Sequence, residues 1–256
     1  MLKKNLLALA AASVVFVTNS FAANFADEVV AYNSGVGYVP RFTNAFTVLG
    51  APSQINLYGD AVDFFDPPYG TNQILSIGEG GSLTVRFDTP VLNLPKNKFG
   101  IDFIIFGNSG FIITNDFDFN TYDWIGTPAT DGSLFGQNFG ETQVSVSRDG
   151  VNFYTLNPSL APTVDFLFPT DGDGDPHTPV YPSLTQNDFA GLTAEQMHAL
   201  YHGSAGGAGY DISWAQDGNG KNVFLPEIRY VRVDVLSGKV EIDAFSAVCT
   251  PPGLRR

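Results

Sequence analysis

Residues 142–156 read TQVSVSRDGVNFYTL, and this stretch predicts an antiparallel β-hairpin. Polar and apolar side chains alternate over residues 142–147, which is the period of a strand with one buried face. Asp149-Gly150 follows, and this dipeptide favours a tight hairpin turn because both residues accept positive φ angles. Residues 152–156 then form the returning strand.

Four more segments of the chain carry strand-like patterns: residues 83–87, 101–106, 228–235 and 240–248. The second segment is apolar on both sides of Asp102, which is typical of a central strand. Gly and Pro, 27 and 16 residues, are spread through the chain and supply turns. Many short strands with turns between them predict an all-β fold, a jelly roll or β-sandwich of the galactose-binding-like type.

One short α-helix is expected as an insertion into this β fold. Thr193 and Gln196 have the spacing of a capping box, and Gly203 is typical of a helix end. The pattern predicts a helix of about ten residues with an apolar stripe made of Leu192, Met197, Leu200 and Tyr201. Residues 158–186, rich in Pro, Asp and Thr, predict a long surface loop.

The N-terminal residues 1–22 predict a signal peptide. Lys3 and Lys4 precede an apolar run over residues 6–17, and small residues stand at the −3 and −1 positions of a cut after Ala22. The run is shorter than the ~20 residues that span a bilayer. We therefore expect residues 23–256 to form a single exported domain without membrane insertion, located outside the cell, on its surface or in the periplasm.

The charge balance limits the partners. The chain has 26 Asp and Glu against 13 Lys and Arg, a formal net charge of −13, and such a chain repels nucleic acids and anionic lipids. Its carboxylates are ligands that hard divalent cations prefer. Cys249 is the only cysteine, so one chain holds neither a disulfide nor a cysteine metal site. A buried or inert thiol is favoured over pairing between chains, and the oligomeric state stays open.

Several stretches together resemble a group of exported bacterial surface proteins, many of which carry a C-terminal PEP-CTERM sorting signal. The resemblance runs from about residue 30 to 248 and rests on the order and spacing of GGSLTVRF (80–87) with Pro90-Val91, GIDFIIFGN (100–108), VSVSRDGVNF (144–153), AGL (190–192), AGYDI (208–212), and IRYVRV (228–233) with IDAF (242–245). It implies a jelly-roll sandwich on the cell surface. The sorting signal does not carry over, because residues 250–256 contain no Pro-Glu-Pro motif and no apolar helix. We expect a released or non-covalently held protein.

The acidic motif Asp171-Gly-Asp173-Gly-Asp175 is a candidate calcium loop. Three carboxylates at alternate positions can converge on one Ca²⁺, as in the first half of an EF-hand loop. Pro176 and Pro182 stand where an EF-hand needs Gly and Glu, so the motif is not an EF-hand. The alternative is a solvated acidic loop.

Asp243 is a second candidate calcium ligand. Glu241 and Asp243 stand two residues apart in a predicted strand and would face the same side, where a cation relieves their repulsion. In several carbohydrate-binding jelly rolls the final strand supplies an Asp to a structural Ca²⁺, an analogy at the level of the fold. The expected partners of Asp243 are Asp102, Asn108 or Asp211. The alternative is an exposed strand face paired with Arg229 or Arg232.

Recognisable catalytic motifs are incomplete. Glu241-Ile-Asp243 resembles the Glu-x-Asp-x-x-Glu motif of jelly-roll glucanases, but Ser246 replaces the last carboxylate of the pair that a retaining glycosidase needs. His198 and His202 have a zinc-binding spacing on the predicted helix, without the Glu that serves as base in zincins. Two histidines near the end of a helix also suit its dipole. We therefore expect no enzymatic activity.

Aromatic side chains at Tyr69 and over residues 111–124 cluster with Asp and Asn side chains. Tyr122 and Trp124, with Asp118 and Asp123, are candidate ligand-binding residues, because aromatic faces stack on sugar rings and carboxylates bond hydroxyls. The alternative is a loop that packs its aromatic side chains into the core. The sequence thus predicts a non-catalytic, calcium-stabilised protein that binds a glycan or matrix component. A structural surface protein without a small ligand and a glycoside hydrolase-like enzyme remain as alternatives.

Overall fold

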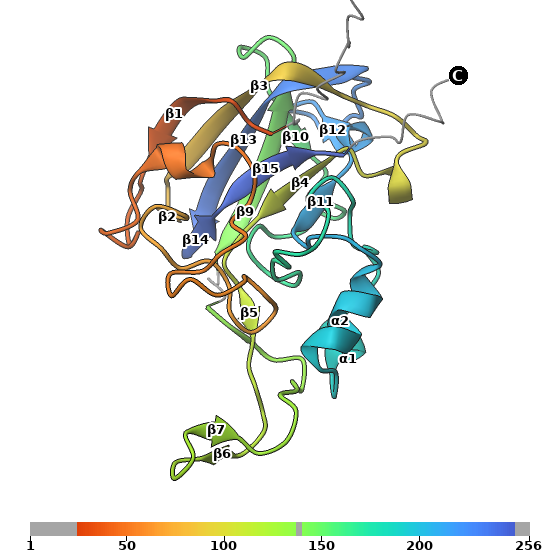
Figure 1. The fold of residues 1–256 in the computed structure, drawn as a ribbon. Coiled ribbons are helices and arrows are strands. Elements are labelled where there is room, and N and C mark those ends of the chain that lie inside the picture. Colours follow the sequence, from red (N-terminus) through yellow and green to blue (C-terminus); the bar gives the residue numbers. More distant parts are fainter. Residues whose placement is uncertain (1–24, 137–139, 249–256) are drawn as a thin grey trace, which may run out of the picture.

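The computed structural model describes residues 25–136 and 140–248. The predicted signal peptide and Cys249 lie outside the described residues. Within them the chain forms antiparallel sheets packed face to face, with only short helices added (Figure 1). The all-β sandwich predicted from the sequence is confirmed. The described part of the chain contains no helix of the length and apolar character needed to cross a membrane.

The larger sheet has six antiparallel strands. Val231 in its centre pairs with Val85 on one side and with Val146 on the other. Leu83, Val85 and Phe87 alternate toward the interior, as a period of two requires. The strands, in spatial order, are β1 (Glu28–Asn33), β3 (Ser82–Leu92), β13 (Glu227–Ser237), β9 (Glu141–Ser147), β10 (Tyr154–Leu156) and β12 (Ala215–Gln216).

The opposite layer consists of a three-stranded sheet and a two-stranded sheet. The first has the order β11 (Ala208–Tyr210), β4 (Phe103–Phe106), β15 (Ala244–Ala247), and the second pairs β14 (Lys239–Ile242) with β2 (Leu75–Gly78). The central position predicted for residues 101–106 is confirmed, because β4 is the middle strand and buried throughout.

Residues 240–248 are predicted to form a single strand. In the structure this segment forms two strands, which are separated at Asp243. β14 pairs with β2, and β15 pairs with β4, so the chain changes partner at this residue. The Asp243 carboxylate accepts hydrogen bonds from the backbone N–H of Ser53 at 2.7 Å and from its hydroxyl at 2.8 Å. These bonds hold the interruption in place.

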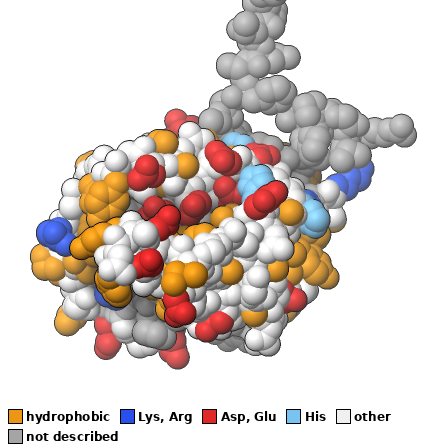
Figure 2. Space-filling model, turned by 60° about the horizontal axis from the view of Figure 1, so that its bottom comes forward, with side chains coloured by type: hydrophobic (Ala, Val, Ile, Leu, Met, Phe, Trp, Pro, Cys, Tyr) orange, Lys and Arg blue, Asp and Glu red, His pale blue; other side chains and the backbone are white. Residues whose placement is uncertain are grey.

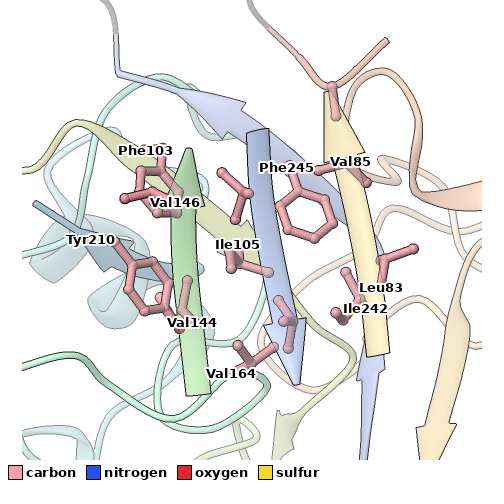
Figure 3. Close-up of a cluster of buried hydrophobic side chains, with 14 of the residues drawn as sticks. Leu83, Val85, Phe103, Ile105, Val144, Val146, Val164, Tyr210, Ile242 and Phe245 are labelled. Atoms are coloured by element: carbon pink, nitrogen blue, oxygen red, sulfur yellow. The ribbon is translucent and has the colours of Figure 1, made fainter. Parts of the chain in front are cut away.

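The main core lies between the two layers. Val85, Val144 and Val146 of the large sheet face Ile105 and Phe245 of the opposite layer (Figure 3). Burying one such side chain contributes about 1.5–3 kcal/mol to stability. The alternating pattern that predicts the strands therefore also supplies the main stabilising interaction.

The β9–β10 hairpin forms at the predicted turn. Tyr154 pairs with Val146, and Gly150 has a φ of +74°. The Asp149 carboxylate accepts hydrogen bonds from the backbone N–H groups of Val151 at 2.9 Å and Asn152 at 2.8 Å. These donors stabilise the charged form and lower the pKa of Asp149.

The predicted helix is α2 (Ala194–Tyr201), and its capping box is confirmed. The Thr193 hydroxyl accepts from the Gln196 N–H at 3.4 Å, and Gln196 Oε1 accepts from the Thr193 N–H at 2.9 Å. The helix ends at His202, which has a left-handed conformation. A second, four-residue helix was not expected: α1 (Gln186–Phe189). The remaining helical turns are η1 (Ala45–Val48), η2 (Lys98–Gly100) and η3 (Ile212–Trp214).

The connection between the β4 and β9 strands contains two small two-stranded sheets. β5 (Gly110–Phe111) pairs with β8 (Leu134–Phe135), and β6 (Phe117–Asp118) pairs with β7 (Asp123–Trp124). Of these two sheets, only the β6–β7 pair is a hairpin. The β6–β7 hairpin projects away from the sandwich (Figure 1).

The prediction that residues 158–186 form a surface loop is wrong in part. Val164, Asp165, Thr170 and Asp171 are buried. The Val164 side chain enters the main core, and the Asp165 carboxylate accepts backbone hydrogen bonds from other segments. The segment is therefore a structural part of the sandwich, and it contributes to the site described next.

Candidate functional site

A cleft of about 1140 Å³ opens beside β14 and the β2–β3 turn. The loops between η1 and β2 form its other side, close to β5 and β14 (Figure 1). Its lining combines apolar, aromatic, acidic and amide side chains with one lysine: Val36, Gly37, Asn56, Leu57, Tyr58, Asp66, Pro67, Tyr69, Glu79, Gly80, Asn108, Phe135, Gly136, Gly238, Lys239 and Glu241.

Two backbone arrangements form the walls of the cleft. Val36 and Glu79 exchange backbone hydrogen bonds at 2.9 Å, which holds the chain after β1 against the β2–β3 turn. On the other wall, Asn56 Oδ1 accepts from the backbone N–H of Tyr58 at 2.9 Å and of Asp60 at 3.0 Å. This side-chain turn holds a tight loop in which the Tyr58 side chain stays 82% exposed.

A buried carboxylate lies at the floor of the cleft. Glu241 is 3% exposed, and its Oε1 lies 3.2 Å from Lys239 Nζ. Its Oε2 accepts a hydrogen bond from Asn108 Nδ2 at 2.8 Å. A buried charge needs such an opposite charge and such donors, because leaving water costs several kcal/mol per ion. Both carboxylate oxygens of Glu241 therefore have protein partners.

The Asp165 carboxylate links two backbone segments at the floor of the cleft, the one after β4 and strand β14. Its Oδ1 accepts from the N–H groups of Asn108 at 2.7 Å and Ser109 at 2.9 Å, and its Oδ2 accepts from the N–H of Glu241 at 3.2 Å. A Cβ at Gly107 would lie 2.2 Å from Asp165 Oδ1, so the close approach requires glycine there. Sequence reasoning missed Asp165, because nothing in a Pro-rich segment marks one aspartate as a buried acceptor.

Two residues that line the cleft each have a buried amide atom without a hydrogen-bond partner among the described residues. The two atoms are Asn108 Oδ1 and Asn56 Nδ2, on side chains of residues that are 2% and 7% exposed. An unsatisfied buried donor or acceptor costs about 1–3 kcal/mol, and native structures contain few of them. One acceptor and one donor at the same cleft therefore point to a polar ligand.

Aromatic side chains line the same cleft. Tyr58, Tyr69 and Phe135 keep 82%, 49% and 40% of their surface exposed. Tyr69 is oriented by Phe42, whose ring centre lies 5.1 Å away at an angle of 54°. Exposed aromatic faces next to polar groups suit ligands that have both apolar faces and hydroxyl edges.

The cleft has an acidic balance. Among the described residues, Asp66, Glu79 and Glu241 line it together with a single cationic residue, Lys239, which pairs with Glu241. The face shown in Figure 2 has the same character more widely, with acidic side chains spread across its middle and Lys and Arg toward its edges. The local potential therefore disfavours anionic ligands.

Two carboxylates of the predicted calcium loop, those of Asp171 and Asp175, have separate protein partners. Asp171 Oδ2 lies 2.5 Å from Nδ1 of His198, and Oδ1 accepts from the N–H of Asp173 at 3.1 Å. Asp175 accepts from the N–H of His177 at 3.0 Å. Among the residues that the structure describes, no three His, Cys, Asp or Glu side chains form a group that could hold a metal ion. This donor arrangement does not fit a calcium site, and calcium binding stays a prediction from the sequence.

The second predicted calcium group is not brought together around Asp243, although Asp211 lies close enough to Asp102 to raise the pKa of its carboxyl group. Asp243 and Asp102 lie at opposite ends of the β4–β15 ladder. Asp102 accepts from the N–H groups of Leu94 at 3.1 Å and Ile212 at 3.0 Å. Burial raises the pKa of both carboxyl groups to about 7.

Two further members of that group have other roles. Asp211 caps η3 by accepting from the N–H of Ser213 at 2.7 Å, while Asn108 lies in the cleft with Glu241. The alternative of an exposed strand face is wrong, because Glu241 and Asp243 are both buried. The two arginines expected there bind elsewhere: Arg229 to the backbone oxygens of Phe87 and Asp88, and Arg232 to Asp234.

The predicted ligand-binding aromatics lie on the β6–β7 hairpin. Trp124 and Phe119 pack edge to face on Phe117, with ring centres 5.1 Å and 5.2 Å away. Tyr122 is 80% exposed, and Asp118 and Asp123 accept hydrogen bonds within the hairpin. The alternative that the aromatics of this stretch pack into the core is wrong for the hairpin residues but correct for Phe111, which is buried in a core cluster with Phe189. The hairpin is a surface separate from the cleft, since none of the hairpin residues lines it.

Comparisons with known proteins assign no family. No family model matches the chain, and no curated protein matches it. One solved structure, a pectin binding carbohydrate binding module in a monoclinic crystal form, has 11% sequence identity and a TM-score of 0.28, with 88% of this chain and 94% of that chain covered. At this TM-score the similarity establishes neither a family nor a ligand for this chain.

Proposed function

We propose that this protein is an exported, non-catalytic glycan-binding protein and that the cleft beside β14 is its binding site. One observation carries the proposal. The residues that line the cleft include exposed aromatic side chains and also Asn108 and Asn56, whose buried Oδ1 and Nδ2 atoms have no hydrogen-bond partner in the described residues.

This combination of groups suits a saccharide. A sugar ring presents a C–H face that stacks on aromatic side chains such as Tyr58 and Tyr69, and a hydroxyl edge that can both donate and accept hydrogen bonds. The volume of about 1140 Å³ lies above the ~300–1,000 Å³ of most small-molecule sites. A cleft of this size has room for several linked sugar units.

The state of Glu241 supports a role without catalysis. A retaining glycosidase uses two carboxyl groups about 5 Å apart, one as nucleophile and one as acid. Glu241 is engaged by Lys239 and Asn108. Asp165, whose carboxylate reaches the Glu241 backbone, accepts three backbone N–H groups. Neither carboxylate is free to act as nucleophile or acid.

The proposal includes export to the cell exterior, which is supported by features of the amino-acid sequence. The pattern of residues 1–22 supports secretion, and the resemblance to PEP-CTERM-associated surface proteins supports a place on or outside the cell. A surface location would bring the cleft into contact with extracellular polysaccharide.

A glycan array followed by calorimetric titration tests the proposal. Wild type is expected to bind a saccharide, and Tyr58→Ala to weaken that binding at least tenfold, about 1.4 kcal/mol, by removing a stacking face. Phe224→Ala is the matched control, since Phe224 is 81% exposed and lies outside the cleft. Equal losses in both variants, or measurable hydrolysis of the bound glycan, would contradict the proposal.

The β6–β7 hairpin is the competing surface and needs its own variant. Tyr122→Ala removes its most exposed aromatic side chain. The cleft proposal expects wild-type affinity in this variant. A loss confined to Tyr122→Ala would move the glycan site to the hairpin.

A further inference from the structure

We propose that the cleft selects saccharides that donate hydrogen bonds and carry no negative charge, and that it discriminates against uronic acid and sulfated sugars. This inference rests on the proposed glycan-binding function and names the class of glycan. Three features of the cleft carry it: the chemistry of the unpartnered Asn108 atom, the excess of acceptor groups, and the pairing of Lys239.

The unpartnered atom of Asn108 requires a donor. Its Nδ2 is used by Glu241, so the free Oδ1 can only accept a hydrogen bond. A hydroxyl, amide or ammonium group can donate to it. A carboxylate or sulfate oxygen has no hydrogen to give, so an anionic group placed there would leave Oδ1 unsatisfied and add repulsion between two oxygens.

Acceptors predominate among the charged side chains of the cleft. The carboxylates of Asp66, Glu79 and Glu241 line it, and an ionised carboxylate accepts hydrogen bonds without donating any. A polyhydroxyl ligand matches these groups because each hydroxyl supplies a donor. A polyanionic ligand brings further acceptors and like charges instead.

The lysine cannot reverse this balance. Anionic sugars are held in proteins by Arg or Lys side chains that form charge-assisted hydrogen bonds. Lys239 is the sole cationic residue in the described lining, and its ammonium group lies 3.2 Å from Glu241 Oε1. Its positive charge already compensates the buried Glu241, so an anion that binds to the same ammonium group adds a negative charge that no second cation of the described lining balances.

Matched saccharides test the inference directly. The probes are oligosaccharides of equal length that are neutral, amino-substituted, uronic or sulfated, measured by array and then by calorimetry at low and high salt. We expect the neutral or amino-substituted members to bind and the uronic and sulfated ones to bind at least tenfold more weakly. The difference in affinity between neutral and anionic saccharides should become smaller at high salt, because salt screens the repulsion between charges near the surface.

Two variants locate the discrimination in the cleft. Glu241→Gln keeps an acceptor for Asn108 Nδ2 and releases Lys239 from its ion pair, while Glu79→Gln removes an exposed charge from the rim. Both are expected to raise uronate affinity relative to neutral affinity, the first by about tenfold. Glu195→Gln, an exposed position on α2 outside the cleft, controls for the change in net charge.

The outcomes distinguish the proposed selectivity from the proposed glycan-binding function. The proposed selectivity is overturned if uronic or sulfated sugars bind as tightly as neutral ones. It is also overturned if Glu195→Gln changes the ratio of uronate affinity to neutral affinity as much as Glu241→Gln does. In both cases the glycan-binding function stands. If no saccharide of any class binds, both fall.

Discussion

Asn108 Nδ2 donates a hydrogen bond to Glu241 Oε2 at 2.8 Å, although 133 residues separate the two along the chain. The bond joins the segment after β4 to β14 at the floor of the cleft. Asp165 reinforces the same junction by accepting the backbone N–H groups of both residues. Because both side chains are buried, this junction links the shape of the cleft to the stability of the fold.

Replacing the amide of this bond with a second carboxylate should destabilise the protein. Asn108→Asp removes the Nδ2 donor and places a negative charge against Glu241, so the free energy of unfolding at neutral pH should fall by about 2–4 kcal/mol. Urea denaturation followed by fluorescence measures the change. The loss should shrink at acidic pH, where one carboxyl of the pair is protonated. An unchanged midpoint would show that the bond contributes nothing.

The acceptor role of Asp165 predicts an order of stability among three proteins. Asp165→Asn keeps one acceptor oxygen and tolerates the φ of +59°. Asp165→Ala removes the acceptor of three backbone N–H groups. Each lost hydrogen bond should lower the free energy of unfolding by about 1 kcal/mol or more. We expect wild type to be the most stable, then Asp165→Asn, then Asp165→Ala. Thermal and urea unfolding should give the same order, and equal stability of the two variants would contradict the acceptor role.

The raised pKa values of Asp102 and Asp243 predict that the free energy of unfolding falls as the pH rises. Burial raises the pKa of each carboxyl from 3.8 to about 7, so between these values the native state holds protons that the unfolded state has released. The free energy of unfolding then decreases with pH, by at most ~1.4 kcal/mol per pH unit for each group, and the decrease ends above about pH 7.

Urea denaturation from pH 4.5 to 7.5 measures this slope. Asp243→Asn should reduce it, because the amide does not titrate, while an exposed acid such as Glu195, replaced by Gln, should leave it unchanged. A stability that rises with pH across this window would contradict the assignment for both carboxyl groups.

Local patterns explain why part of this structure could be predicted from the sequence. The Asp149-Gly150 turn and the capping box at Thr193 involve residues within a few positions of one another, so their chemistry is visible in the chain itself. The alternation of residues 83–87 likewise predicts which side chains enter the core. These features define the strands, one hairpin and one helix.

The candidate site depends on contacts that no local pattern contains. Asp165 lies 57 residues from Asn108 and 76 from Glu241. The carboxylate pattern Glu241-Ile-Asp243 indicated a shared cation, whereas the break at Asp243 sends one carboxylate to Ser53 and the other to Asn108 and Lys239. The sequence predicts Asn108 as a partner of Asp243 at a metal ion, whereas the structure places it at the cleft, where its Oδ1 has no partner among the described residues.

Calcium removal tests the expectation that the protein is calcium-stabilised. The acidic motif at Asp171 predicts a cation, whereas the structure already gives two of its three carboxylates protein donors, with His198 on Asp171 and Thr178 on Asp175. Because these hydrogen bonds stabilise the loop without a metal, we expect excess chelator to leave the melting temperature unchanged and added Ca²⁺ to raise it by no more than added Mg²⁺. Differential scanning calorimetry of wild type and Asp173→Asn measures this. A chelator-induced drop that Asp173→Asn abolishes would place calcium in this loop, and would mean that the Asp171–His198 contact opens when the ion binds.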